Sequence, residues 1–149
     1  MAEGIAIEDP DGVLTFLNPA GAALVASLLN QPLGGAPRYF RRLAGAPGLA
    51  RALFQALTEL RMAGLEAKGL SASGFVSPDK GAELQALMQA FEKTLETLRL
   101  ADAARTFRIA MEAQPGRRLL FADASVRWKV MERRLLEHLA GGEVRFLPF

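Results

Sequence analysis

Apolar residues recur every three or four positions over much of the chain, which is the spacing of one face of a helix. The clearest example follows Ser77-Pro78, where Ser is a good N-cap and Pro suits the first helical position. Glu and Lys lie opposite the apolar stripe of this segment, which consists of Leu84, Leu87, Met88, Phe91, Leu95 and Leu98. This pattern predicts a long amphipathic helix whose apolar face lies in the core.

Three further helices follow from similar signals. Asn18-Pro19 predicts the start of a helix that runs to about Leu29, and residues 31–37 then form a loop. Pro47 opens a helix that Gly64 ends, with leucines along one face at positions 49, 53, 57 and 60. Asp102 is the expected N-cap of a helix that reaches about Ala113. Residues 38–43 predict a short helix, and residues 66–76 a looser stretch with one helical turn.

Strands are expected at both ends of the chain. Residues 4–8 and 12–17 predict a strand pair joined by the turn sequence Asp9-Pro10-Asp11-Gly12. Near the C-terminus, residues 118–122 predict a buried strand, residues 126–139 a helix and residues 143–147 a second strand. Strand, helix and strand in about thirty residues indicate a βαβ unit with parallel strands.

These elements predict a predominantly helical α/β fold, with a helical bundle-like insertion packed on a small, partly parallel sheet. We expect residues 1–37 to form the strand pair and first helix, 38–116 a helical subdomain, and 117–149 the βαβ unit. At 149 residues the chain fits one compact domain. We also expect it to be a fragment of a larger protein.

Charge is distributed unevenly along the chain. Residues 1–37 hold four acids and no Lys or Arg; because the whole chain carries +2, the remainder carries +6. This is a mild bias towards anionic partners and far weaker than the basic stripe of a dedicated DNA-binding domain. Apolar runs too short to cross a bilayer and the lack of a basic N-terminal region favour a cytoplasmic protein without membrane contact.

The sequence lacks the usual catalytic signatures. It contains no phosphate-binding glycine loop, no nucleophile elbow and no cysteine, and it has a single histidine, His138. We therefore expect no enzymatic activity, no metal site and no cofactor. Asp123 ends a buried strand, where α/β folds place ligand contacts. The interpretation that we favour for Asp123 is a cap of the following helix.

The middle of the chain resembles the helical insertion of superfamily I helicase-like subunits, particularly of the AddB/RexB type of helicase–nuclease. The sequence PGLARALFQALTELRMAGL (47–65) matches a helix that ends in a Leu-Arg-x-Ala-Gly phrase. In KGAELQALMQAFEKTLETLRLADAARTFRIA (80–110), a long helix with Phe before Glu is followed by a Leu-x-Asp turn. The resemblance covers roughly residues 40 to 149.

The C-terminal segment LLFADASVRWKVMERRLLEHLA lies where such proteins carry the Walker B strand and the helix after it. An active helicase has Asp-Glu after this strand, to bind Mg²⁺ and orient water, whereas this chain has Asp123-Ala124. The resemblance therefore implies a degenerate motor, with Asp123 as the remaining acid, in a subunit that handles DNA without hydrolysing ATP at this site. The parent protein would be an ATP-dependent helicase or exonuclease.

The resemblance implies a scaffolding role in DNA recombination and repair, with single-stranded or forked DNA and a partner helicase–nuclease subunit as partners. Arg41, Arg42 and Arg61 are the side chains that we expect to contact phosphate, because the guanidinium fork matches phosphate oxygens. Solvated helix faces are the alternative explanation for these arginines.

The N-terminal sequence EGIAIEDPDGVLTFLNPAGAALVA (3–26) resembles the opening of a PAS sensor domain, with two strands around Asp-x-x-Gly and then Asn-Pro-Ala. That resemblance implies a sensory or signalling module with three further antiparallel strands. Residues 38–113 show helical periodicity instead, so the PAS-like module is the second interpretation. A helical protein-interaction domain is the third.

Overall fold

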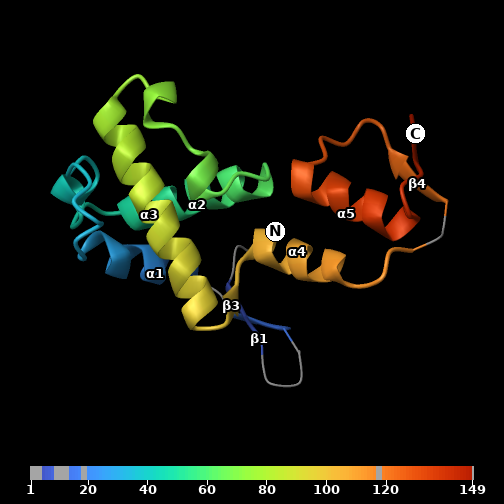
Figure 1. Cartoon of the computed structure of the whole chain (residues 1–149), viewed down its shortest axis with the longest axis horizontal. Coiled ribbons are helices and arrows are strands. Elements are labelled where there is room, and N and C mark those ends of the chain that lie inside the picture. Colours follow the sequence, from blue (N-terminus) through green and yellow to red (C-terminus); the bar gives the residue numbers. More distant parts are fainter. Residues whose placement is uncertain (1–4, 9–13, 18–19, 117–118, 149) are drawn as a thin grey trace.

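The computed structural model describes residues 5–8, 14–17, 20–116 and 119–148. Its main helices are α1 (Ala20–Leu29), α2 (Leu49–Met62), α3 (Pro78–Thr97), α4 (Ala103–Glu112) and α5 (Val130–Ala140). Figure 1 shows α1, α2 and α3 at one end of the molecule and α5 at the other, with α4 between them. The chain has the predominantly helical α/β fold that the sequence predicts.

Two small sheets accompany the helices. Strands β1 (Ile5–Glu8) and β2 (Leu14–Leu17) pair in antiparallel fashion, and the two-residue β3 (Leu100–Ala101) adds to the other edge of β1. At the C-terminus, β4 (Leu120–Asp123) and β5 (Val144–Leu147) are parallel, with α5 as the crossover. This confirms the βαβ unit. The strand β3 was not predicted, and the two sheets are separate.

The larger core lies between α1, α2 and α3. Its buried side chains include Leu53 and Leu57 of α2 and Leu87 and Phe91 of α3, which confirms the predicted faces of both helices. A smaller cluster joins α2, α4 and α5 through Met62, Ala104 and Met131. Leu98 is the exception to the predicted stripe of α3: it is 57% exposed because α3 ends one residue earlier.

Helix ends mostly follow the predicted signals. The side chain of Ser77 accepts a hydrogen bond from the amide of Lys80, and Asp102 accepts one from the amide of Arg105. Gly64 ends α2 with a φ of +82°, which favours glycine. Arg99 turns the chain from α3 into β3 with a φ of +52°. The turn at 9–13 and the Asn18-Pro19 cap lie outside the described residues.

The described segments between α1, α2 and α3 contain three short 3₁₀ turns. The segment between α1 and α2 contains η1 (Arg41–Leu43), which is shorter than the helix predicted for residues 38–43. Between α2 and α3 lie η2 (Ala67–Gly69) and η3 (Ala72–Gly74), where the sequence predicts one helical turn. The described strands do not form the five-stranded antiparallel sheet that a PAS domain requires, because residues 38–113 are mostly helical.

Candidate functional site

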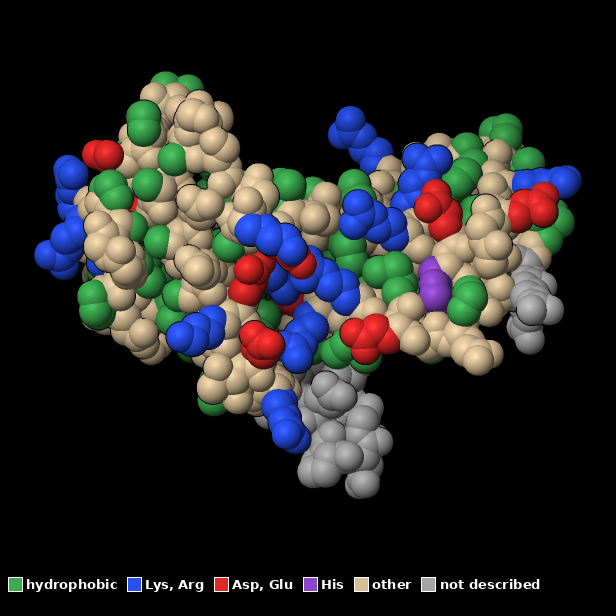
Figure 2. Space-filling model, in the orientation of Figure 1, with side chains coloured by type: hydrophobic (Ala, Val, Ile, Leu, Met, Phe, Trp, Pro, Cys, Tyr) green, Lys and Arg blue, Asp and Glu red, His purple; other side chains and the backbone are tan. Residues whose placement is uncertain are grey.

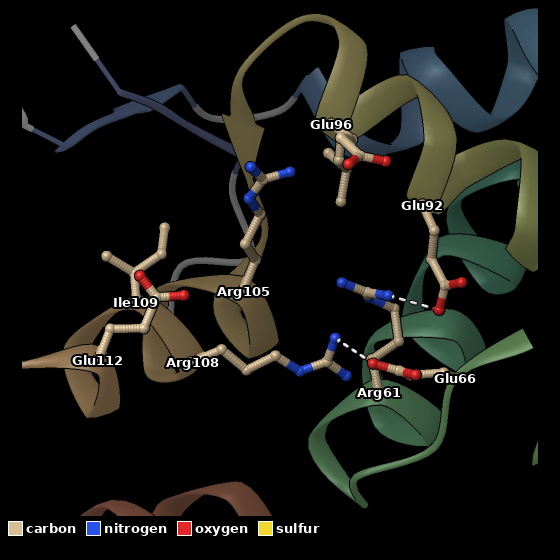
Figure 3. Close-up of a pocket in the computed structure, with 9 residues that line it drawn as sticks. Arg61, Glu66, Glu92, Glu96, Arg105, Arg108, Ile109 and Glu112 are labelled. Carbon is tan, nitrogen blue, oxygen red and sulfur yellow. Dashed lines mark hydrogen bonds and ion pairs between the residues drawn. The ribbon is translucent and has the colours of Figure 1, made fainter. Parts of the chain in front are cut away.

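A charged groove of about 480 Å³ lies between α3 and α4. In Figure 2 acidic and basic side chains gather in the middle of the face where these two helices approach each other. Leu95 and Ile109 contribute apolar surface to the groove, and its charged lining includes Arg61, Glu66, Glu92, Glu96, Arg105 and Arg108. Figure 3 shows these charged side chains converging from α2, α3, α4 and the segment after α2.

Arg61 lies at the base of the groove and is only 2% exposed. Its Nε lies 2.5 Å from Asp102 Oδ2 and its Nη2 lies 3.0 Å from Asp102 Oδ1, so the guanidinium binds this carboxylate with two parallel hydrogen bonds. Its Nη1 donates to Glu92 Oε1 at 2.8 Å. Burial alone lowers the pKa of Arg61, but the hydrogen bond and attraction of Asp102, followed by those of Glu92, outweigh burial and raise it.

The two partners of Arg61 have further tasks of their own. Asp102 Oδ1 accepts the amide of Arg105 and so caps α4, while Glu92 Oε1 accepts the amide of Ala67 at 3.2 Å. Arg61 therefore ties α2, α3 and the start of α4 together. Arg61 was predicted as a phosphate contact; in the structure its guanidinium is buried and bound by two carboxylates.

Arg41 is a second internal arginine. Its Nε lies 2.5 Å from Oε1 of Glu83, a fully buried residue of α3, and its side chain is 8% exposed. Glu83 also accepts the amide of Phe40, and Arg41 donates to the carbonyls of Gln31 and Ala36. Arg41 thus fixes the segment between α1 and α2 onto α3. Arg41 was also predicted as a phosphate contact; in the structure its guanidinium is occupied by Glu83 and by backbone carbonyls.

Arg42 is the one predicted contact residue that is exposed. Its Nε donates to the carbonyl oxygen of Arg38, which is also exposed. Neither side chain forms an ion pair with an acid among the described residues. Arg42 therefore keeps a guanidinium face that is accessible to an anion.

The rim of the groove contains residues that the sequence did not single out. Arg108 Nη1 and Lys68 Nζ both lie 2.8 Å from carboxylate oxygens of Glu66. The hydrogen bond from Lys68 is the main cause of the lowered pKa of Glu66, which the attraction of Arg108 lowers further. Arg105 points into the groove in Figure 3 and forms no ion pair within the described part of the chain.

One signal for this rim was present in the sequence. Arg105 and Arg108 are three residues apart, and Glu92 and Glu96 are four apart, so each pair shares one helix face. What the spacing could not show is that the two faces meet. Because four glutamates line the groove beside three arginines, it does not favour a polyanion.

Asp123 lies at the carboxyl end of β4, beside Leu147 of the parallel strand β5. Its Oδ1 accepts the amide of Ser125 at 2.8 Å, and its carbonyl accepts Nε1 of Trp128 at 2.9 Å. The backbone hydrogen bond from Ser125 lowers the pKa of Asp123, and the serine side chain lowers it further. Asp123 is therefore ionised and organises the turn after β4.

The preferred prediction for Asp123, a cap of the following helix, is wrong. Helix α5 begins at Val130, four residues later than predicted, and its N-cap is Lys129. Glu132 accepts the amide of Lys129 at 2.8 Å, as in a capping box. The residues between β4 and α5 are held instead by two hydrogen bonds, one from the amide of Ser125 to Asp123 and one from the indole of Trp128 to the carbonyl of Asp123.

No metal-ligand cluster of three or more His, Cys, Asp or Glu side chains occurs among residues 5–8, 14–17, 20–116 and 119–148. His138 lies at the end of α5, with Nε2 2.8 Å from the carbonyl oxygen of Ala113. This contact joins α5 to the segment after α4. Within the same described residues, no helix combines the length and apolar character needed to cross a membrane.

Neither the protein-family models nor the curated proteins compared with this chain gave a match.

Proposed function

We propose that this chain is a non-hydrolytic, DNA-handling scaffold segment of a helicase–nuclease that acts in DNA recombination and repair. The observation that carries the proposal is the C-terminal βαβ unit. It has one acid, Asp123, at the carboxyl end of a parallel strand, and Ala124 follows where an active motor has a second acid. Alanine cannot bind a metal or orient a water molecule for attack on a phosphate.

The open face of the β4–β5 sheet supports a place within a larger assembly. Helix α5 packs on β5, and on the other side of the sheet Phe121 and Leu147 are 57% and 39% exposed. Strand alternation places Asp123 and the exposed Arg145 on that same side. Parallel sheets occur almost only with both faces covered. We therefore propose that elements of the helicase–nuclease cover this side, while the helical body supplies a rigid platform.

Buried ion pairs support the scaffolding role of the helical body. The pairs Arg41–Glu83 and Arg61–Asp102 each join parts of the chain that are about forty residues apart. Removing one partner of such a pair leaves a buried charge without compensation, which costs about 3–5 kcal/mol. Arg41 and Arg61 stabilise the packing of the helical body, and exposed arginines such as Arg42 provide the contacts with phosphate.

The first test is fluorescence anisotropy of labelled single-stranded, forked and duplex DNA titrated with the chain at about 50 mM and about 200 mM salt. We expect tighter binding to single strands and forks than to the duplex, and weaker binding at the higher salt because phosphate contacts release counterions. Binding must persist without ATP. Absence of binding at low salt would contradict the proposal and leave a protein-interaction domain as the better explanation.

A further inference from the structure

A long stretch of the chain is basic and free of acids. Residues 30–58 contain four arginines and no Asp or Glu. Arg41 is the only one of the four with an ion pair among the described residues, and its partner Glu83 comes from α3. The segment between α1 and α2 therefore keeps a local positive charge at its surface. Figure 2 shows Lys and Arg side chains at the edge of this end of the molecule.

Within this segment one aromatic side chain lies between two exposed arginines. Tyr39, the only tyrosine of the chain, is 40% exposed, and Arg38 and Arg42 are exposed on either side of it in the sequence. The guanidinium of Arg42 donates to the backbone carbonyl of Arg38, which holds it beside the backbone that precedes Tyr39.

The surface is held rigidly from below. The ring of Phe40 meets the ring of Tyr39 edge to face, with centroids 5.1 Å apart and planes at 78°. The amide of Phe40 and the guanidinium of Arg41 are both bound to buried Glu83. Such fixation lowers the entropic cost of binding a ligand at Tyr39.

We propose that Arg38, Tyr39 and Arg42 form a contact site for single-stranded nucleic acid, an inference that rests on the proposed function. A base stacks on the ring of Tyr39, and the two guanidinium groups bind the flanking phosphates. Stacking is tolerant of sequence because every base has a π-face, and it requires an unpaired base. The site therefore distinguishes single strands from duplexes without reading sequence.

The test compares four variants with the unaltered chain by anisotropy, using a labelled oligothymidylate. Tyr39→Ala should weaken binding at least about fivefold, because stacking on an aromatic residue is lost. Tyr39→Phe keeps a ring and should bind more tightly than Tyr39→Ala. Arg42→Ala should reduce the slope of log affinity against log salt by about 0.7, the value for one phosphate contact on a single strand.

Arg127→Ala is the matched charge control. Arg127 is an exposed arginine of the loop between β4 and α5. In Figure 1, β4 and α5 lie at the opposite end of the molecule from α1 and α2. Arg127→Ala should leave the affinity unchanged, and circular dichroism should show that all variants remain folded. An equal loss of affinity in Arg127→Ala and Arg42→Ala would overturn the inference, because binding would then follow net charge alone.

Fluorescence gives an independent readout of stacking. Tyr39→Trp adds a second indole to a chain whose only tryptophan is Trp128, and oligothymidylate should quench the added emission. If the unaltered chain binds single strands while Tyr39→Ala binds equally well, the contact site is refuted and the proposed function stands. If the unaltered chain does not bind DNA at all, both proposals fail. Equal displacement by polyglutamate would indicate an acidic peptide as the ligand and also refute the contact site.

Discussion

Asp123 illustrates how one carboxylate can be held in its ionised form on the surface. The amide of Ser125 donates to Asp123 Oδ1 and is the main cause of the lowered pKa of Asp123, and the nearby serine hydroxyl also favours the charged form. Because the pKa of Asp123 is lowered, its contribution to stability is present above about pH 3.9, the ordinary pKa of Asp, and is lost as the pH falls through the folded-state pKa.

Replacing Ser125 tests this explanation. Ser125→Ala removes the side-chain donor but keeps the backbone amide, so the pKa of Asp123 should rise towards its ordinary value without reaching it. The measurement is an NMR titration of the Asp123 carboxyl carbon between about pH 2 and pH 6. Ser73→Ala, in η3, serves as a control that should not alter the titration. An unchanged midpoint in Ser125→Ala would show that the hydroxyl makes no contribution.

The contact between α1 and α2 depends on the absence of a side chain. A Cβ atom placed on Gly21 would lie 2.1 Å from the ring of Phe54, which is buried and packs against Phe91 with centroids 6.1 Å apart. The two helices therefore approach closely only because residue 21 is glycine. Close packing of this kind leaves Phe54 little room to move aside.

Gly21→Ala should consequently destabilise the protein. The gain in helix propensity is at most about 1 kcal/mol, whereas overpacking a filled core costs about 1–3 kcal/mol. We expect a net loss of about 1–2 kcal/mol in the free energy of unfolding, measured by urea denaturation. Gly45→Ala is the matched control, because no atom lies within 4 Å of its added Cβ, and it should be neutral or slightly stabilising. Equal stability of the two variants would contradict the packing argument.

At the level of elements, the sequence predicted what depends on neighbours along the chain. Leucine spacing and caps such as Ser77 and Asp102 located α2, α3 and α4, since those signals act within a few residues. The start of α5 was predicted four residues too early because the turn after Asp123 is held by tertiary hydrogen bonds. The strand β3 was missed because its two residues pair with β1, almost a hundred positions away.

At the scale of the whole molecule, the ion pairs decide which arginines are accessible. Arg41 and Arg42 are adjacent, yet one is buried against Glu83 and the other is exposed. The partners Glu83 and Asp102 lie more than forty residues from the arginines that they bind, and no local pattern indicates such pairs. For the same reason the groove between α3 and α4 could not be predicted.

Arg61 should be a major determinant of global stability, because it links α2 with α3 and α4. Arg61→Met keeps much of the side-chain volume but leaves the buried carboxylate of Asp102 without its cation. We expect a loss of about 3–5 kcal/mol in the free energy of unfolding, measured by urea denaturation. Arg61→Lys should lose less, since it restores the charge without the two parallel hydrogen bonds.

A double variant separates the ion pair from general effects of burial. Asp102→Asn retains an oxygen that can cap α4, and in the Arg61→Met background it removes the uncompensated charge. The double variant should therefore be more stable than Arg61→Met alone. If Arg61→Met unfolds at the same urea concentration as the unaltered chain, the proposed linking role is wrong.

The uncovered side of the β4–β5 sheet also bears on the fate of the chain inside a cell. Within the described residues, the two short parallel strands have free edges and expose Phe121 and Leu147 beside the charged Arg145, and such edges are a template for pairing with another chain. Chaperones and proteases continuously sort chains that expose such surfaces. If the proposed partner subunit covers this sheet, copies of the chain made in excess of that subunit would be removed, and the cellular level of the chain would follow that of the partner.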